Sequence, residues 1–89
     1  MPTISMKIAS VSPQPDWILT ITSEDGIIGN FDVKPYLEFD AFTELKDILQ
    51  FRKITNGRYF VEWDCGADLS ADTIEAQWVI VDTPIAQPA

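Results

Sequence analysis

Histidine is absent from this chain, and cysteine occurs only once, at Cys65. The missing histidine removes the commonest general base, the commonest zinc ligand and every serine–histidine or cysteine–histidine pair. A single cysteine cannot form an internal disulfide, so the chain is expected to be cytoplasmic. No basic residue stands beside Cys65 and acidic residues surround it, which favours a passive turn cysteine over a reactive thiol.

Long apolar runs and glycine-rich loops are missing as well. No apolar run approaches the roughly 18 residues that a membrane span needs. The first residues lack the charged and apolar regions of a secretory signal, so none is expected. The glycines are isolated, at Gly26, Gly29, Gly57 and Gly66, and this spacing excludes the loops that cradle nucleotide phosphates.

Basic residues are scarce: six stand against 14 acidic ones, for a net charge of −8. Arg58 is the last base, and the six acidic residues after it contribute −6 of the −8. Such a surface repels phosphate backbones, so direct nucleic-acid binding is not expected. It attracts a basic protein partner and accelerates their encounter. The plain alternative is a solubilising surface on a small domain.

Apolar residues make up 46% of the 89 residues, including three tryptophans and five phenylalanines. This content is enough to build a core in a single domain. We expect one domain over residues 1–83 and a flexible tail over residues 84–89.

The strongest structural pattern is a hairpin between residues 17 and 33. Apolar residues alternate along 17–22 and recur along 27–33, and the Asp25-Gly26 pair between them suits the positive φ of a tight turn. An earlier strand around Ile8 is expected to stop at Ser12 to Pro15, because proline offers no amide hydrogen to a ladder.

The middle of the chain predicts short helices. Pro35 suits the start of a helical turn. Asp47 can cap a second helix over residues 48–53, with Ile48 and Phe51 facing inward and Leu49 as a further candidate. Apolar side chains at spacings of three are expected to lie on the core between the two helices: Phe39, Phe42 and Leu45.

Residues 59–77 predict a strand, a turn and a helix, and we expect the strand to join the sheet of the hairpin. Tyr59, Val61 and Trp63 fall on one face of the strand, and Phe60, Glu62 and Asp64 fall on the other. Gly66 suits the positive φ of the turn, and Ser70 is a good N-cap for the helix. Residues 79–81 can form a final strand.

These elements predict a small α+β domain, with an antiparallel or mixed sheet built on the hairpin and two or three short helices. The three tryptophans are expected in the core, and partial exposure of one would mark an interface. Asp64, Asp68 and Asp72 follow each other at intervals of four residues. Their spacing matches no calcium loop, so neither metal binding nor a cofactor is expected.

A candidate surface for a protein partner follows from the charge pattern. It combines five acidic residues of the last third with one tryptophan: Glu62, Asp64, Asp68, Asp72, Glu75 and Trp78. No catalytic residues are predicted.

Three segments of the chain resemble one known family. The opening MKIASVSPQPDWILTITSEDGIIGNFDVKPYLE, the central AFTELKD and the closing WDCGADLSADTI are similar to the domain-of-unknown-function family numbered 2442. The resemblance covers about residues 6–74. The chain departs from the family pattern at Ser23, where an apolar residue is common, at Cys65, where asparagine is common, and at Ala71, where proline is common.

The resemblance implies a small α+β domain and brings no catalytic residues. Related chains are small bacterial proteins. Some are fused to a helix-turn-helix module, and others are encoded beside a small family regarded as toxins, with this domain as the antitoxin. The present chain has no helix-turn-helix segment, so a DNA-binding role is not carried over.

We therefore expect a non-catalytic binding module, antitoxin-like or regulatory, that binds a basic protein. The alternative is a regulatory domain that binds a small molecule or a metal through the Asp64 to Asp72 turn, and an enzyme ranks third. The apolar stretch Trp78 to Val81 also predicts a homodimer, because a free strand edge can pair with a second copy.

Overall fold

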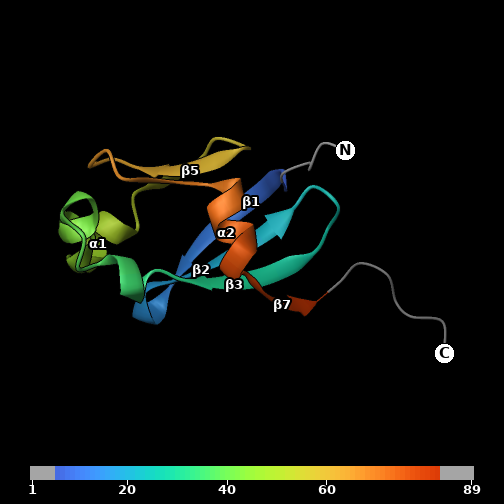
Figure 1. The fold of residues 1–89 in the computed structure, drawn as a ribbon, viewed down its shortest axis with the longest axis horizontal. Helices are drawn as coiled ribbons and strands as arrows, with labels where there is room; N and C mark the ends of the chain where they lie inside the picture. The colour runs from blue at the N-terminus through green and yellow to red at the C-terminus, as the bar shows by residue number, and fades with distance from the viewer. Residues whose placement is uncertain (1–5, 83–89) are drawn as a thin grey trace, which may run out of the picture.

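Seven strands surround one core in the computed structural model, which describes residues 6–82. In this part of the chain the first sheet has the strand order β1–β2–β3–β7 and the second has the order β4–β5–β6. Figure 1 shows the second sheet above the first, with the helix α2 (Ala71–Gln77) in front of the strands. The predicted α+β class is confirmed, with two antiparallel sheets where one was expected. The predicted tail, residues 84–89, lies outside the described residues.

The first sheet is built on the predicted hairpin. Its strands are β1 Ile8–Gln14, β2 Ile18–Ser23, β3 Ile28–Asp32 and β7 Val79–Asp82. Leu19 lies opposite Phe31 across the hairpin, and both side chains are fully buried. Gly26 has a φ of 91° in the turn. The hairpin, its turn and the final strand are thus confirmed.

β1 ends at Gln14, just before Pro15, so the predicted stop within Ser12 to Pro15 is confirmed, although Ser12 and Pro13 still belong to the strand. Pro13 lies opposite Leu19 of β2. β1 is an edge strand with a neighbour on one side only, and a missing amide hydrogen is tolerated at an edge. A short 3₁₀ turn, η1 Pro15–Trp17, then leads into β2.

The second sheet contains β4 Ile54–Asn56, β5 Phe60–Trp63 and β6 Asp68–Ser70. The prediction that the strand over residues 59–63 joins the sheet of the hairpin was wrong. Val61 of β5 pairs with Asn56 and with Leu69 instead. The flanking strands have only three residues each, which is too short for an alternating pattern to be recognised in the sequence.

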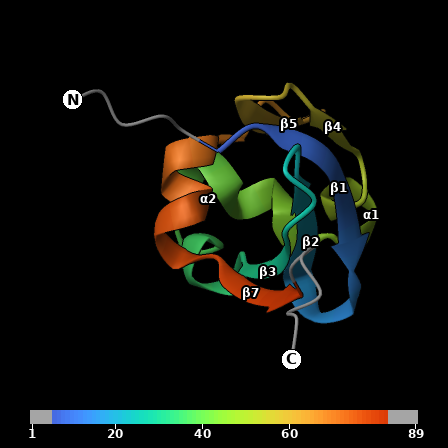
Figure 2. The same cartoon turned by 90° about the vertical axis from the view of Figure 1, so that its right-hand side faces the viewer.

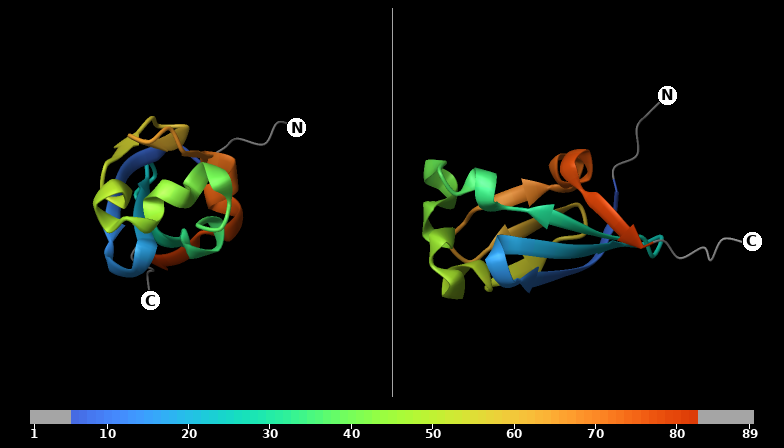
Figure 3. Two further views of the ribbon diagram at one scale, coloured as in Figure 1. Left: turned by 90° about the vertical axis from the view of Figure 1, so that its left-hand side faces the viewer. Right: turned by 90° about the horizontal axis from the view of Figure 1, so that it is seen from below.

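Short helical segments complete the fold: η2 Lys34–Tyr36, η3 Asp40–Lys46, α1 Ile48–Phe51 and α2 Ala71–Gln77. Figure 3 shows that the first three gather at one end of the molecule. The Asp47 side chain accepts a hydrogen bond from the amide of Leu49, and Ser70 accepts one from Thr73, so both predicted caps are confirmed. No helix within residues 6–82 is long and apolar enough to span a membrane.

The end formed by η3 and α1 differs in detail from the prediction. α1 stops at Phe51 and makes a single turn, which directs Phe51 into the core and leaves Ile48 38% exposed. Phe42 and Leu45 lie on the core as predicted, whereas Phe39 is 58% exposed. Residues three apart share a helix face, yet in this single turn only Phe51 reaches the core, while Ile48 and Leu49 stay exposed.

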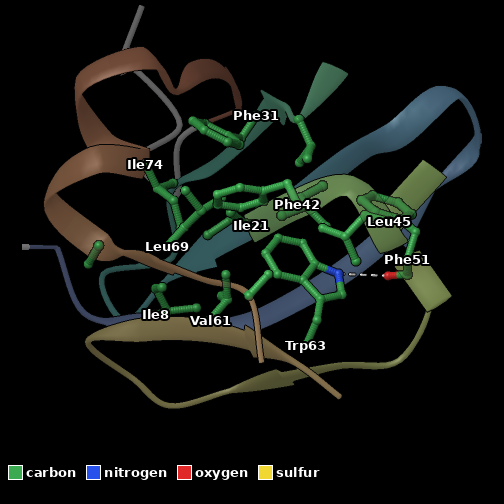
Figure 4. Packing of buried hydrophobic residues seen from close by; sticks show 14 of the residues in the cluster. Ile8, Ile21, Phe31, Phe42, Leu45, Phe51, Val61, Trp63, Leu69 and Ile74 are labelled. Atoms are coloured by element: carbon green, nitrogen blue, oxygen red, sulfur yellow. Dashed lines mark hydrogen bonds between the residues drawn. The ribbon is translucent and has the colours of Figure 1, made fainter. Parts of the chain in front are cut away.

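Trp63 lies at the centre of the core, among side chains from both sheets and from the helical end (Figure 4). Its indole N–H donates a hydrogen bond to the carbonyl oxygen of Phe51 at 2.9 Å. The indole N–H of Trp17 donates to the carbonyl of Leu45 at 2.6 Å. Trp63 is buried as predicted, while Trp17 and Trp78 are partly buried against the core.

The two sheets are joined at Ile8, the first residue of β1. Its amide donates a hydrogen bond to the carbonyl of Arg58 at 2.7 Å, and its carbonyl accepts one from the Asn56 side chain at 2.9 Å. Arg58 lies in the turn between β4 and β5, so β1 touches the second sheet there. Figure 2 shows β1 beside β4 and β5, with α2 on the opposite side of the core.

Gly26→Val should lower the free energy of unfolding by about 1–2 kcal/mol, because a side chain at this positive φ clashes with the backbone. Urea denaturation of the wild type and the variant measures the difference. Gly26→Asn is the matched control and should lose clearly less, since asparagine tolerates positive φ. Equal stability of the valine variant and the wild type would contradict the turn geometry.

Candidate functional site

The outer face of the second sheet carries a pair of opposed acidic residues. Glu62 on β5 lies directly opposite Asp68 on β6, and both are exposed. The alternation of β5 turns Val61 and Trp63 into the core and therefore Glu62 outward. Like charges at directly opposed positions destabilise a sheet. The fold thus brings together two of the six residues predicted for a partner surface.

An open hollow of about 250 Å³ lies next to this pair, lined by Thr55, Glu62, Trp63 and Asp64. Thr55 lies opposite Glu62 on β4. The amide of Asp64 donates a hydrogen bond to the carbonyl of Lys53 at 3.0 Å, which fixes the chain just after β5. Two acidic residues therefore line one hollow at the end of the second sheet.

An aromatic side chain that the predicted surface omitted lies on the same face. Phe60 precedes Glu62 by two residues on β5 and is 40% exposed. The Phe60 ring packs so closely over Gly57 that a Cβ atom at residue 57 would collide with it. The alternation of residues 60–64 puts Phe60 on the same face as Glu62, and that signal could have added Phe60 to the predicted surface.

Tyr59 is 51% exposed, whereas Val61 and Trp63 are buried, so the prediction that Tyr59 shares their face of the strand was wrong. β5 begins one residue later, and Tyr59 belongs to the preceding turn. Its carbonyl accepts a hydrogen bond from the amide of Ala71 at 2.8 Å. The Arg58 guanidinium lies over its ring, 5.6 Å from the centroid.

The remaining acids of the predicted surface lie on α2, which follows β6 directly. Asp72 lies in the first turn of α2 and Glu75 in its second half, and both are exposed. In Figure 2 α2 runs down one side of the molecule, away from the second sheet and towards β7. These two residues therefore extend the acidic surface around a side of the molecule.

Trp78, the sixth residue of the predicted surface, is turned inward. Its ring packs on Gly29 of β3, so closely that a Cβ atom at that glycine would collide with it. The indole N–H is buried and has no hydrogen-bond partner within residues 6–82. Trp78 thus packs the end of α2 against the first sheet and does not lie with Glu62 and Asp68.

The basic residues of the described chain make their ion pairs elsewhere. Lys34 lies 3.1 Å from both Asp16 and Asp32, and Arg58 lies 2.7 Å from Glu24. The hydrogen bond to Glu24 raises the pKa of the Arg58 guanidinium. No ion pair found within residues 6–82 uses four of the predicted acids: Glu62, Asp64, Asp68 and Glu75.

The three aspartates that are spaced by four residues lie on three different elements. Asp64 is in the turn after β5, Asp68 begins β6, and Asp72 is in α2. Cys65 has a free thiol in the same turn and is partly buried. Among the described residues, no group of three acidic or cysteine side chains is placed to hold a metal ion.

Glu62→Gln should raise the free energy of unfolding by about 0.2–1 kcal/mol at low salt, because it removes the repulsion between opposed carboxylates. Thermal and urea denaturation measure the change, and added salt should reduce it. Glu38→Gln, at an exposed acid outside the second sheet, is the control for loss of net charge. An equal gain in both variants would show that net charge, and not the pair, is responsible.

The family model described as Protein of unknown function (DUF2442) matches residues 8–79. The match covers most of the chain, so the chain belongs to this family, which confirms the resemblance seen in the sequence. Searches of curated proteins and of solved structures found no significant match.

Proposed function

We propose that this member of the DUF2442 family is a non-catalytic binding module whose acidic outer face, formed on β5 and β6, binds a basic protein. The main support for this proposal is the Glu62–Asp68 pair. The two residues lie opposite each other on neighbouring strands, and neither has an ion-pair partner within residues 6–82. The fold itself gains nothing from this pair, because opposed like charges cost stability. A lysine or arginine of a partner would convert the repulsion into attraction.

The surroundings of the pair suit a long basic side chain. Glu62 and Asp64 line the hollow of about 250 Å³, and Phe60 is exposed on the same face. Carboxylates accept paired hydrogen bonds from the planar arginine guanidinium. An aromatic ring beside them can contact the cation or its aliphatic stem. The face therefore favours arginine or lysine on a protein surface.

The charge of the whole chain supports the same kind of partner. At −8, the molecule attracts a basic surface from a distance and speeds their association, in a manner that salt weakens. The same charge repels the phosphates of nucleic acids. The absence of histidine and of clustered glycines supports binding rather than catalysis.

Binding of this kind would act by covering a basic surface of the partner. If that surface carries the partner's activity, covering it inhibits the partner, which is the action of an antitoxin-like or regulatory protein. The acidic chain then needs no reaction chemistry of its own.

The proposal is tested by capture from the native host with the tagged full chain, followed by mass spectrometry and titration of the captured protein. The wild type should retain a basic protein in stoichiometric amount at low salt. The double variant Glu62→Gln/Asp68→Asn should bind it at least about tenfold more weakly, since loss of a desolvated charge pair costs about 2 kcal/mol or more.

A matched control removes the same charge from another part of the surface. Glu38→Gln/Glu44→Gln changes two exposed acids and should leave the affinity almost unchanged. If both double variants lose affinity equally, the attraction depends on net charge and the β5–β6 face is not the site. Capture of a metabolite or a metal in place of a protein would support the small-molecule alternative.

A further inference from the structure

The outer face of the second sheet is as wide as a single α-helix. The sheet has the strand order β4–β5–β6, and neighbouring strands lie about 4.8 Å apart, so about 10 Å separates its two outer strands. An α-helix with its side chains is about 10–12 Å in diameter. In Figure 1 the second sheet lies above the first, so its outer face points away from the core. One helix of a partner is therefore wide enough to cover this face.

A partner strand cannot join the middle of this face through backbone hydrogen bonds. β5 is the central strand and is already paired with β4 on one side and with β6 on the other. An element that lies over the face must therefore satisfy its own backbone groups. A helix does so with its internal hydrogen bonds, whereas a single extended segment has none. The face thus favours a helix over an extended segment.

The side chains along β5 change from apolar to acidic in regular steps. Phe60 is 40% exposed, Glu62 lies opposite Asp68 of β6, and Asp64 lines the same hollow of about 250 Å³ as Glu62. Residues two apart on a strand are about 7 Å apart, and residues four apart on a helix are about 6 Å apart along its axis. Long side chains on a helix can therefore follow these steps.

We propose that the basic partner presents an amphipathic helix that lies along β5, an inference that rests on the proposed function. An apolar residue of this helix contacts Phe60, and a basic residue four positions away contacts Glu62 and Asp68. A second basic residue, four positions further, reaches Asp64. The partner is thus recognised by one apolar and two basic residues at positions i, i+4 and i+8, read in either direction along β5.

Phe60 gives the face a selectivity that net charge alone does not provide. Exposed aromatic side chains at the centre of an interface are frequent anchors of binding. The ring is held in place against Gly57, so little side-chain freedom is lost when a partner covers it. A basic segment without an apolar residue at the right spacing would leave Phe60 uncovered. The position of the apolar residue relative to the bases therefore determines which basic segments bind tightly.

Two synthetic peptides of identical composition test this inference. Both have an alanine-rich helical host with one leucine and two arginines, placed at i, i+4 and i+8 in the first peptide and at i, i+2 and i+4 in the second. Only the first peptide has all three residues on one side of a helix. Calorimetric titration of the full chain at low salt should show that the first peptide binds at least about tenfold more tightly.

Two matched variants locate the helix on the face. Phe60→Ala should weaken the first peptide at least about threefold and leave the second almost unchanged, because only the first places its leucine on the ring. Leu49→Ala removes an exposed apolar residue of α1 and should change neither affinity. Circular dichroism confirms that each variant is folded.

The outcomes separate this inference from the proposed function. If the wild type binds both peptides equally and Glu62→Gln/Asp68→Asn binds neither, the helix is wrong and the acidic face remains the binding site. An unchanged affinity of Phe60→Ala for the first peptide would also overturn the helix. So would failure of the first peptide to bind while a captured partner still depends on Glu62 and Asp68. Peptide binding that the double variant fully retains would contradict the proposed function itself.

Discussion

The hydrogen bonds of Ile8 are the constraint on which the arrangement of the two sheets depends. Its amide reaches the carbonyl of Arg58, and its carbonyl is held by the side chain of Asn56. The same asparagine accepts a hydrogen bond from the Arg58 amide at 2.7 Å, which holds the turn between β4 and β5. Within residues 6–82 the two sheets share no strand-to-strand hydrogen bonding of their own. The bonds of Ile8 are therefore what ties the backbone of β1 to the second sheet.

This junction closes the core and thereby orients the acidic face. The inner side of β5 contributes Val61 and Trp63 to the same core as Leu19 and Phe31 of the hairpin. Once those residues are fixed inward, the alternation of the strand leaves Glu62 outward. The opposed carboxylates thus lie on strands that the core holds in place. This rigidity reduces the conformational entropy that a binding site there would lose on association.

Local chemistry predicted the elements well and their assembly less well. The Asp25-Gly26 turn, the caps Asp47 and Ser70, and the outward position of Glu62 follow from single residues or short spacings, and all are present. The division into two sheets could not be predicted, because it depends on three-residue strands and on a contact between Ile8 and Arg58, which are far apart in the sequence.

The candidate surface was predicted only in part, because it too depends on strand pairing that the sequence does not reveal. Glu62 and Asp68 are brought together by a register between β5 and β6, and β6 was not recognised in the sequence. Trp78 was assigned to the surface by its place in the chain, yet Gly29 leaves room for its ring on the first sheet. Only the paired structure shows that a missing side chain on β3 draws the tryptophan inward.

Hydrogen exchange at the Ile8 amide tests most directly whether the two sheets form one cooperative unit. In one cooperative unit this amide should exchange as slowly as the amides of the central strand β2, because both open only on global unfolding. Asn56→Ala should then lower the protection of both together, since it leaves the carbonyl of Ile8 without its partner. An Ile8 amide that exchanges much faster than β2 while β5 stays protected would show that the sheets separate independently, and would contradict a single cooperative unit.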